Sequence, residues 1–242
     1  MNDDLDQLLT SLKMHRTREV LPRALDRAIR EQPAYDAFLA DILREEYAYK
    51  RQKSLEYRIE HARIPELFTI ETFPFDMQPA VSAPVIKLLA GLDFMTTGFN
   101  LIFIGPPGVG KTGLATGILY KALVNGYRGR FIRAQDLFDE INASLLDRSS
   151  RRVLNELCGY SLLVIDELGY LTLKPDQTNI FFKLMEERYT AKKPTIITTN
   201  LDFEEWYEFL GQKTMVKALL DRVRHNCHTI RIDGTTLRTP TG

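Results

Sequence analysis

The sequence is poor in cysteine, has no long hydrophobic run and carries no excess charge of either sign. Its two cysteines, Cys158 and Cys227, are far apart and form no Cys-x-x-Cys pair. This excludes a disulfide framework, and we expect both to be small buried residues. The longest apolar stretches, such as Leu101–Ile104, are far shorter than the about 20 residues of a transmembrane helix. The acidic N-terminus lacks the apolar core of a secretory signal, so we expect a cytoplasmic protein with no membrane partner.

The balance of charge leaves the question of a nucleic-acid partner open. Lysine plus arginine and aspartate plus glutamate number 32 each, but a basic stripe on one face is enough to bind phosphates. The chain has 242 residues, of which 44% are hydrophobic. That length is sufficient for one substantial α/β domain and a small appendage.

The first 65 residues have the pattern of helices only. Apolar residues recur at helical spacing in three stretches, near residues 5–12, 20–29 and 35–43, and the third helix is predicted to continue to about Arg63, before Pro65. Residues 1–65 therefore predict a small all-helical N-terminal domain. Residues 66–99 predict a proline-containing linker that wraps onto the next domain, followed by an entry helix opened by Pro84.

From residue 100 to residue 242 strands alternate with helices. Strands are predicted at 101–104, 130–133, 161–165, 195–199 and 228–232. Helices are predicted at 111–124, 136–157 with a break near 147–150, 175–191, 202–209 and 214–224. Apolar strands that alternate with helices indicate an α/β domain with a parallel sheet flanked by helices on both faces.

A glycine-rich loop follows the first of these strands. Gly105-Pro106-Pro107-Gly108-Val109-Gly110-Lys111-Thr112 fits G-x-x-x-x-G-K-[ST] and stands between an apolar strand and a helix. The glycines allow backbone N–H groups to point inward at a phosphate, and the positive end of the next helix helps to hold the anion. We predict that Lys111 contacts the β- and γ-phosphates of ATP and that the Thr112 hydroxyl binds Mg²⁺.

The strand at 161–165 ends in two carboxylates, Asp166 and Glu167. Such a pair is common at solvated strand ends, but downstream of a phosphate loop it indicates a metal-holding aspartate and a glutamate that activates water. Asn200 follows the strand at 195–199 and fits equally a contact to that water or a turn. Arg222 and Arg224, taken alone, fit a solvated helix face better than a catalytic role. The run Lys50, Arg51, Lys53 fits a DNA contact or a solvated face equally.

Together these motifs resemble the IstB-like helper ATPases of bacterial insertion sequences, within the DnaA/DnaC branch of AAA+ proteins. The resemblance covers essentially the whole chain. It is carried by the phosphate loop, by Asp-Glu-Leu-Gly-Tyr-Leu at 166–171, by Thr-Thr-Asn-Leu at 198–201 and by Leu-Asp-Arg at 220–222. The resemblance implies a P-loop AAA+ core without a C-terminal helical lid, so that no sensor 2 arginine is assigned.

The resemblance also implies roles for individual residues. Residues 105–113, including Gly113, bind ATP; Asp166 and Glu167 are the Walker B pair; Asn200 matches sensor 1. Arg222 matches an arginine finger that acts on a neighbouring subunit, with Arg224 as the fallback. The helices at 136–157 match an insert that faces DNA, in which Arg148, Arg151 and Arg152 are candidate phosphate contacts.

The expected function is therefore an ATPase that assembles as a homo-oligomer on double-stranded DNA and stimulates a partner transposase. A helicase loader of the DnaC type has the same core and is the alternative. A nucleotide-binding module without turnover is the third possibility, and measured hydrolysis separates it from the other two.

Overall fold

The computed structural model describes residues 3–169, 173–211 and 214–237, apart from the side chains of Thr214, Met215, Ala218, Leu219 and Arg222. The chain divides into two compact units, Met1–Tyr57 and Arg58–Gly242. The division falls inside helix α3 (Tyr35–Ala62), a few residues before Pro65. None of the described helices is long and apolar enough to cross a membrane.

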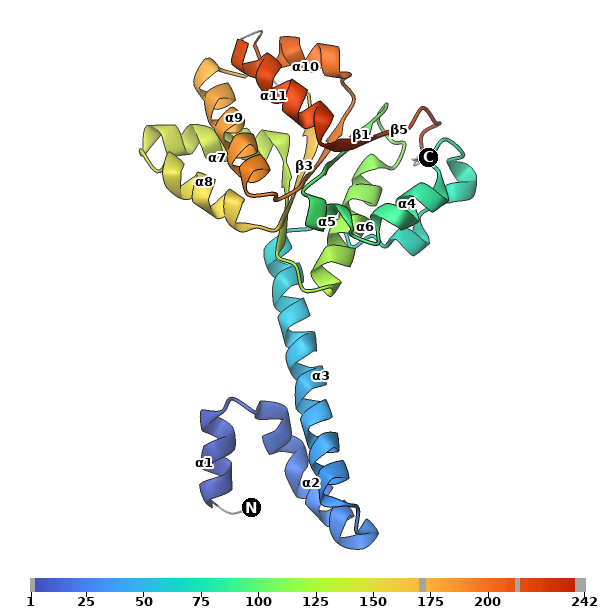
Figure 1. Ribbon diagram of the computed structural model, residues 1–242, viewed down its shortest axis with the longest axis vertical. Helices are drawn as coiled ribbons and strands as arrows, with labels where there is room; N and C mark the ends of the chain where they lie inside the picture. Colours follow the sequence, from blue (N-terminus) through green and yellow to red (C-terminus); the bar gives the residue numbers. More distant parts are fainter. Residues whose placement is uncertain (1–2, 170–172, 212–213, 238–242) are drawn as a thin grey trace, which may run out of the picture. The chain divides into compact units, whose positions relative to one another are not determined.

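The N-terminal unit consists of α1 (Asp3–Ser11), α2 (His15–Glu31) and the first part of α3 (Figure 1). The three helices lie where the apolar spacing predicted them. Their shared core is small: among the residues of this unit that the structure describes, its buried hydrophobic side chains are Leu9, Leu21 and Ile42. Polar contacts supplement it: buried Glu46 accepts a hydrogen bond from the Thr17 N–H at 2.7 Å. Thr17 is in the first turn of α2, so Glu46 satisfies one of the free N–H groups of that turn.

The second unit is built on a five-stranded sheet. Its strands are β1 (Asn100–Ile104), β2 (Gly129–Arg133), β3 (Leu162–Leu168), β4 (Thr195–Thr199) and β5 (Cys227–Arg231). The order across the sheet is β2-β3-β4-β1-β5, and all neighbouring pairs are parallel. The predicted parallel sheet is thereby confirmed. Because β1 lies beside β4 and β4 beside β3, the ends of these three strands meet at one edge.

Helices cover both faces of this sheet (Figure 1). On one face, alternate strand residues such as Ile102, Leu163 and Ile197 join a buried cluster with the helices between β2 and β5. Those helices are α7 (Ala134–Leu146), α8 (Ser150–Gly159), α9 (Pro175–Thr190), α10 (Phe203–Phe209) and α11 (Thr214–His225). On the other face lies α6 (Lys111–Val124), which contacts all strands from β1 to β4.

The break predicted near residues 147–150 is present, between α7 and α8. The linker between α3 and β1 contains two short 3-10 turns, η1 (Ile70–Thr72) and η2 (Phe75–Met77), followed by α4 (Ala83–Leu89) and α5 (Phe94–Thr97). The turn η1 contacts α6. No helix follows β5 among the described residues, which end at Leu237.

A buried arginine, Arg188, holds together several chain segments at one end of the second unit, and the sequence alone did not indicate this role. The Arg188 guanidinium, 1% exposed, donates to Thr195 Oγ1 and to the carbonyls of Leu157, Tyr160 and Pro194 at 2.6–3.0 Å. Burial lowers the pKa of Arg188 to about 10, so it remains charged at neutral pH. Its contacts fasten the ends of α8 and α9 to the start of β4.

The cysteines are only half-buried, and both are free thiols. Burial, aided by the hydrogen bond to Glu187, raises the pKa of the Cys158 thiol to about 11. Burial also raises the pKa of Cys227. The expectation of small buried residues was therefore only approximately right.

Candidate functional site

The glycine-rich loop connects β1 to α6, as the motif requires, and its carbonyl groups are held from several directions. The Lys111 ammonium group donates to the carbonyls of Gly105 and Pro106, both at 2.7 Å. Gly108 and Gly110 have φ angles of 83° and 97°, in the left-handed region that glycine adopts without strain. The loop is therefore curled back on itself, with Lys111 folded across it.

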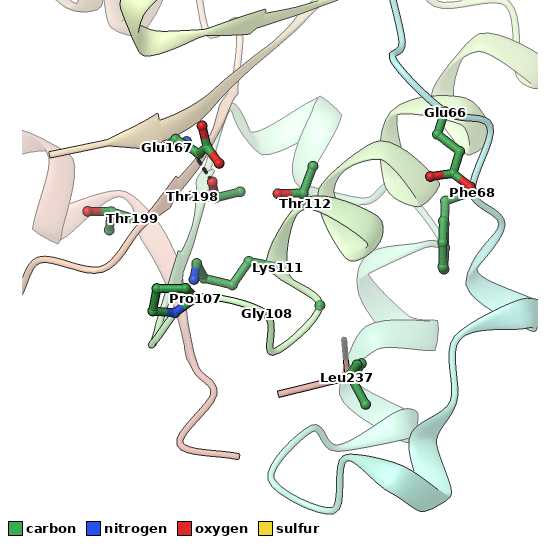
Figure 2. A pocket seen from close by; sticks show the side chains of 11 residues that line it. Glu66, Phe68, Pro107, Gly108, Lys111, Thr112, Glu167, Thr198, Thr199 and Leu237 are labelled. Atoms are coloured by element: carbon green, nitrogen blue, oxygen red, sulfur yellow. Dashed lines mark hydrogen bonds between the residues drawn. The ribbon is translucent and has the colours of Figure 1, made fainter. Parts of the chain in front are cut away.

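A pocket of about 440 Å³ opens over this loop (Figure 2). The strand ends contribute Glu167, Thr198 and Thr199, and the linker contributes Glu66 and Phe68. The complete lining is Glu66, Phe68, Pro107, Gly108, Gly110, Lys111, Thr112, Glu167, Thr198, Thr199 and Leu237. The loop residues and strand ends thus form polar walls, and Phe68 and Leu237 form apolar ones.

Asp166 lies at the base of this site, 3% exposed. Its carboxylate accepts hydrogen bonds from the Thr112 hydroxyl, at 2.9 and 3.1 Å, and from the Thr198 hydroxyl. Burial raises the pKa of Asp166, and the Thr198 and Thr112 hydrogen bonds partly oppose that rise. A buried carboxylate whose hydrogen bonds come from hydroxyls gains from a bound cation, and hydroxyl and carboxylate oxygens are ligands that Mg²⁺ prefers. Thr112 and Asp166 therefore fit a magnesium ion.

Glu167 follows Asp166 but points elsewhere. The register between β3 and β4 shifts between Ile165 and Leu168, and Glu167 has a φ angle of 59°. An irregularity of this kind redirects a side chain and is typical of functional sites. The Glu167 side chain is exposed and lines the pocket, while its N–H donates to Thr198 Oγ1 at 3.0 Å (Figure 2).

Asn200 stands one residue beyond β4, which pairs with β1 as its predicted role requires. The side chain is exposed and its oxygen lies near Gly169. Thr198 and Thr199 form the adjacent part of the pocket wall.

The linker contributes aromatic residues that sequence reasoning did not assign to the site. A Cβ atom added to Gly110 would lie 2.6 Å from the Phe73 ring, and one added to Gly113 would lie 3.4 Å from the Phe68 ring. Gly117 is similarly close to Ile70. These glycines form one face of the loop and α6, and the missing side chains leave room for the linker. Gly113 thus serves the packing of Phe68 beside the pocket.

The two candidate arginine fingers lie on α11. The side chain of Arg222 is outside the described residues, so its role stays a prediction. Arg224 is exposed, lies 3.9 Å from Glu204 Oε1 and stacks over the Phe203 ring at 5.1 Å. In the motif at 166–171, Tyr170 and Leu171 are also outside the described residues.

The predicted DNA-contacting residues differ in how they are paired. Lys50 lies 3.6 Å from Glu46, Lys53 lies 2.8 Å from Glu56, and Arg51 lies over the Tyr47 ring. Arg148, Arg151 and Arg152 are exposed around the turn from α7 to α8.

A row of arginines on α2 was not singled out from the sequence. Arg23, Arg27 and Arg30 follow one another at helical spacing and line a groove of about 550 Å³ in the N-terminal unit. None of the three forms an ion pair with a residue that the structure describes. On the opposite wall, by contrast, Arg44 is 2.8 Å from Asp41. The heptad-like spacing of these arginines was the signal available in the sequence.

The parallel sheet, the phosphate loop and the acidic end of β3 define a nucleotide-binding protein with an AAA+ P-loop fold. Residues 7–241 match the family described as IstB-like ATP binding protein, and the chain belongs to this family. It is similar to a protein named as an ATP-binding protein of insertion sequence IS21 from Pseudomonas aeruginosa. The two are 34% identical over 235 residues, which covers 97% of this chain and 88% of that relative.

Another relative, named for insertion sequence IS5376 of Geobacillus stearothermophilus, is 34% identical over 85% of this chain and 81% of its own. Among solved structures, the DnaC helicase loader has a TM-score of 0.54 and 25% identity, over 62% of this chain and 88% of that one. AMPPCP-bound DnaA from Aquifex aeolicus has a TM-score of 0.59 and 20% identity, over 71% and 51%. The likeness to DnaA shows the fold alone.

Proposed function

We propose that this protein is an ATP-hydrolysing helper of DNA transposition that assembles on duplex DNA and stimulates a partner transposase. Two findings support the proposal. The relatives at 34% identity are named for insertion sequences. In the site, Glu167 lines the same pocket as the phosphate loop, and the Asp166 carboxylate accepts a hydrogen bond from Thr112 at the end of that loop.

The substrate of this pocket is ATP. On binding, the Lys111 ammonium group leaves the carbonyls of Gly105 and Pro106 and contacts the β- and γ-phosphates. The loop N–H groups and the start of α6 hold the remaining phosphate oxygens. Phe68 and Leu237 provide apolar walls for the base.

Thr112 and Asp166 hold Mg²⁺, which when bound neutralises charge on the phosphates. Glu167 accepts a proton from the attacking water. Its position carries the proposal of hydrolysis, because the redirected backbone places a carboxylate on the pocket wall while Thr198 fixes its N–H. Asn200, at the end of β4, orients the same water.

Assembly follows from sharing a site between subunits. Arg222 of one subunit, or Arg224 as the fallback, contacts the γ-phosphate held by the next, so ATP favours the oligomer by linkage. Repeated subunits then present many cationic contacts to the DNA backbone. We propose Arg23, Arg27 and Arg30, together with Arg148, Arg151 and Arg152, as those contacts. Lys50, Arg51 and Lys53 contribute less, because two of them already face carboxylates.

The decisive experiment measures ATPase activity and particle size with ADP, ATP and a slowly hydrolysed analogue, each with and without duplex DNA. Wild-type protein should form larger particles with ATP and DNA and should hydrolyse ATP. Glu167→Gln should bind ATP and remain assembled on DNA, while Lys111→Ala should not bind nucleotide. Rapid turnover by Glu167→Gln would remove Glu167 from its role.

Action between subunits is tested by mixing variants. Arg222→Ala should bind nucleotide but hydrolyse it slowly, and addition of Lys111→Ala should restore some complete interfaces. No recovery at any mixing ratio would argue against a finger from the neighbouring subunit.

A helicase loader is the second candidate, supported by the likeness to the DnaC helicase loader. Capture of partners by the tagged protein separates the two functions, because the helper retains a transposase and the loader a replicative helicase. A module without turnover is tested by the same ATPase assay, since it predicts no hydrolysis even with DNA present.

A further inference from the structure

The residues after β5 lie across the phosphate loop. Ile232–Leu237, here called the strap, begins with a hydrogen bond from the Ile232 N–H to the Ile104 carbonyl at 2.9 Å. A Cβ atom added to Gly105 would lie 2.3 Å from the Ile232 carbonyl oxygen, and one added to Gly108 would lie 2.2 Å from Thr236 Oγ1. Both ends of the strap therefore contact the phosphate loop, and Leu237 lines the pocket (Figure 2).

Gln78 joins the strap, the loop and the linker through one side-chain amide. It is fully buried, and its Nε2 group donates to the Thr235 carbonyl at 2.9 Å and to the Val109 carbonyl at 3.3 Å. A Cβ atom added to Gly234 would come within 1.4 Å of Gln78 Oε1, so glycine at 234 allows this close approach. Two carbonyl acceptors identify the nitrogen side of the amide.

These contacts fix the directions of peptide groups in the loop. The Leu237 N–H donates to the Gly108 carbonyl at 2.8 Å, and Gln78 donates to the Val109 carbonyl. A peptide group is planar and trans, so holding its carbonyl on one side holds the N–H of the following residue on the other. The strap and Gln78 thus orient the N–H groups of Val109 and Gly110, which are among those that cradle a phosphate in such loops.

We propose that Gln78 is a positioning residue for ATP binding, which acts by fastening the strap and the phosphate loop so that the loop N–H groups are preorganised. The inference rests on the proposed ATP binding. No helix follows β5 among the described residues. The strap, which follows β5 instead, contacts the phosphate loop and limits its movement.

Gln78→Met tests the proposal, because methionine has a similar length but no donor. Loss of one or two hydrogen bonds that preorganise the loop predicts about tenfold weaker ATP binding. Binding is measured with a fluorescent ATP analogue, and with inorganic triphosphate as the competitor. Since Gln78 acts on the phosphate cradle, affinity for triphosphate should fall by the same factor as affinity for ATP.

Asn100→Leu is the matched control. Asn100 is also a buried amide, accepts from the Thr195 N–H at 2.8 Å and lies at the opposite end of β1 from the loop. Both variants should lower the melting temperature, but only Gln78→Met should weaken nucleotide binding. Wild-type affinity in Gln78→Met, or weaker binding of ATP without weaker binding of triphosphate, would overturn the proposal.

A second pair of variants keeps the test valid if Gln78→Met does not fold. Leu237→Pro removes the N–H that donates to Gly108, while Leu237→Ala keeps it. Weaker triphosphate binding in the proline variant than in the alanine variant supports the bracing role, and equal binding refutes it. If the wild-type protein binds no nucleotide, the proposed function itself fails, which is a different result from wild-type affinity in Gln78→Met.

Discussion

The Thr198 hydroxyl on β4 donates a hydrogen bond to the Asp166 carboxylate on the neighbouring strand β3. The same oxygen accepts the N–H of Glu167 at 3.0 Å. One side chain therefore orients both carboxylate residues, the one proposed to hold the metal and the one proposed to activate water. Groups that orient metal ligands in this way contribute strongly to activity without contacting the substrate.

Replacing Thr198 by valine should slow hydrolysis while leaving nucleotide binding nearly intact. Valine has almost the same shape but neither donates to Asp166 nor accepts from Glu167. We expect about 10- to 100-fold lower ATPase activity, the usual cost of losing such a supporting contact. Steady-state turnover and nucleotide affinity are the measurements. Thr198→Ser retains the hydroxyl and should stay close to wild type, so equal activity of the valine and serine variants would contradict this role.

Thr198 also illustrates what the sequence could and could not predict. Asp166 and Glu167 were identified because two carboxylates after an apolar strand are chemically distinctive beside a phosphate loop. Threonine is an ordinary strand residue, and its role depends on which strand lies beside β3. Gln78 was missed for the same reason, since its partners come from the loop and from the strap more than 150 residues later. The positions of most helices and strands, in contrast, followed from local periodicity, although β3 extends to Leu168, beyond its predicted end at Ile165, and α5 was not predicted.

Asp166→Asn should stabilise the nucleotide-free protein. Burial raises the pKa of Asp166, so its ionised form is disfavoured in the folded state, and asparagine keeps an oxygen acceptor for the two hydroxyls. At neutral pH we expect a gain of about 1 kcal/mol in the free energy of unfolding, as at other sites where function costs stability. Mg²⁺-dependent nucleotide binding should be lost in the same variant.

The pH dependence of this gain has a definite sign. A raised pKa in the folded state contributes stability that is complete below the unfolded value, about 3.9, and is lost as pH rises through the folded value. In acid, the free energy of unfolding of the wild type therefore approaches that of the asparagine variant. The difference between the two proteins grows as pH rises. Urea unfolding across this range measures it, with the exposed Glu208→Gln as control. A stability difference that already has its full size at acidic pH would contradict a raised pKa of Asp166.

Arg188→Met should destabilise the protein without impairing the pocket. Methionine fills much of the volume, but three carbonyls and the Thr195 hydroxyl lose their donor in the interior. We expect a loss of about 3 kcal/mol or more in the free energy of unfolding, measured by urea denaturation. ATP affinity of the folded variant should be unchanged, because Arg188 contacts the start of β4 and the site lies beyond its end.

The matched control for Arg188 is Arg44→Met, which removes an exposed arginine paired with Asp41. Exposed pairs contribute little, so the change should stay within about 1 kcal/mol. A similar loss of stability in both variants would show that the burial and carbonyl contacts of Arg188 do not contribute more to stability than an exposed ion pair.

Arg23, Arg27 and Arg30 should contribute to DNA binding through the phosphate backbone. From Arg23 to Arg30 the helix rises about 10 Å, so the three guanidinium groups follow one another along the groove without an acidic partner in the described part of the chain. Replacing all three by glutamine should weaken DNA binding for every sequence. The slope of log affinity against log salt concentration should fall by about 1 per arginine.

The control for this row replaces three cations that already have carboxylate partners, Arg16, Arg18 and Arg44. Their charges are largely satisfied within the protein, so the salt slope should change much less although the same net charge is removed. Binding of a labelled duplex is measured at several salt concentrations for both triple variants. Equal slopes for the two variants would mean that DNA binding depends on total charge and not on the row on α2.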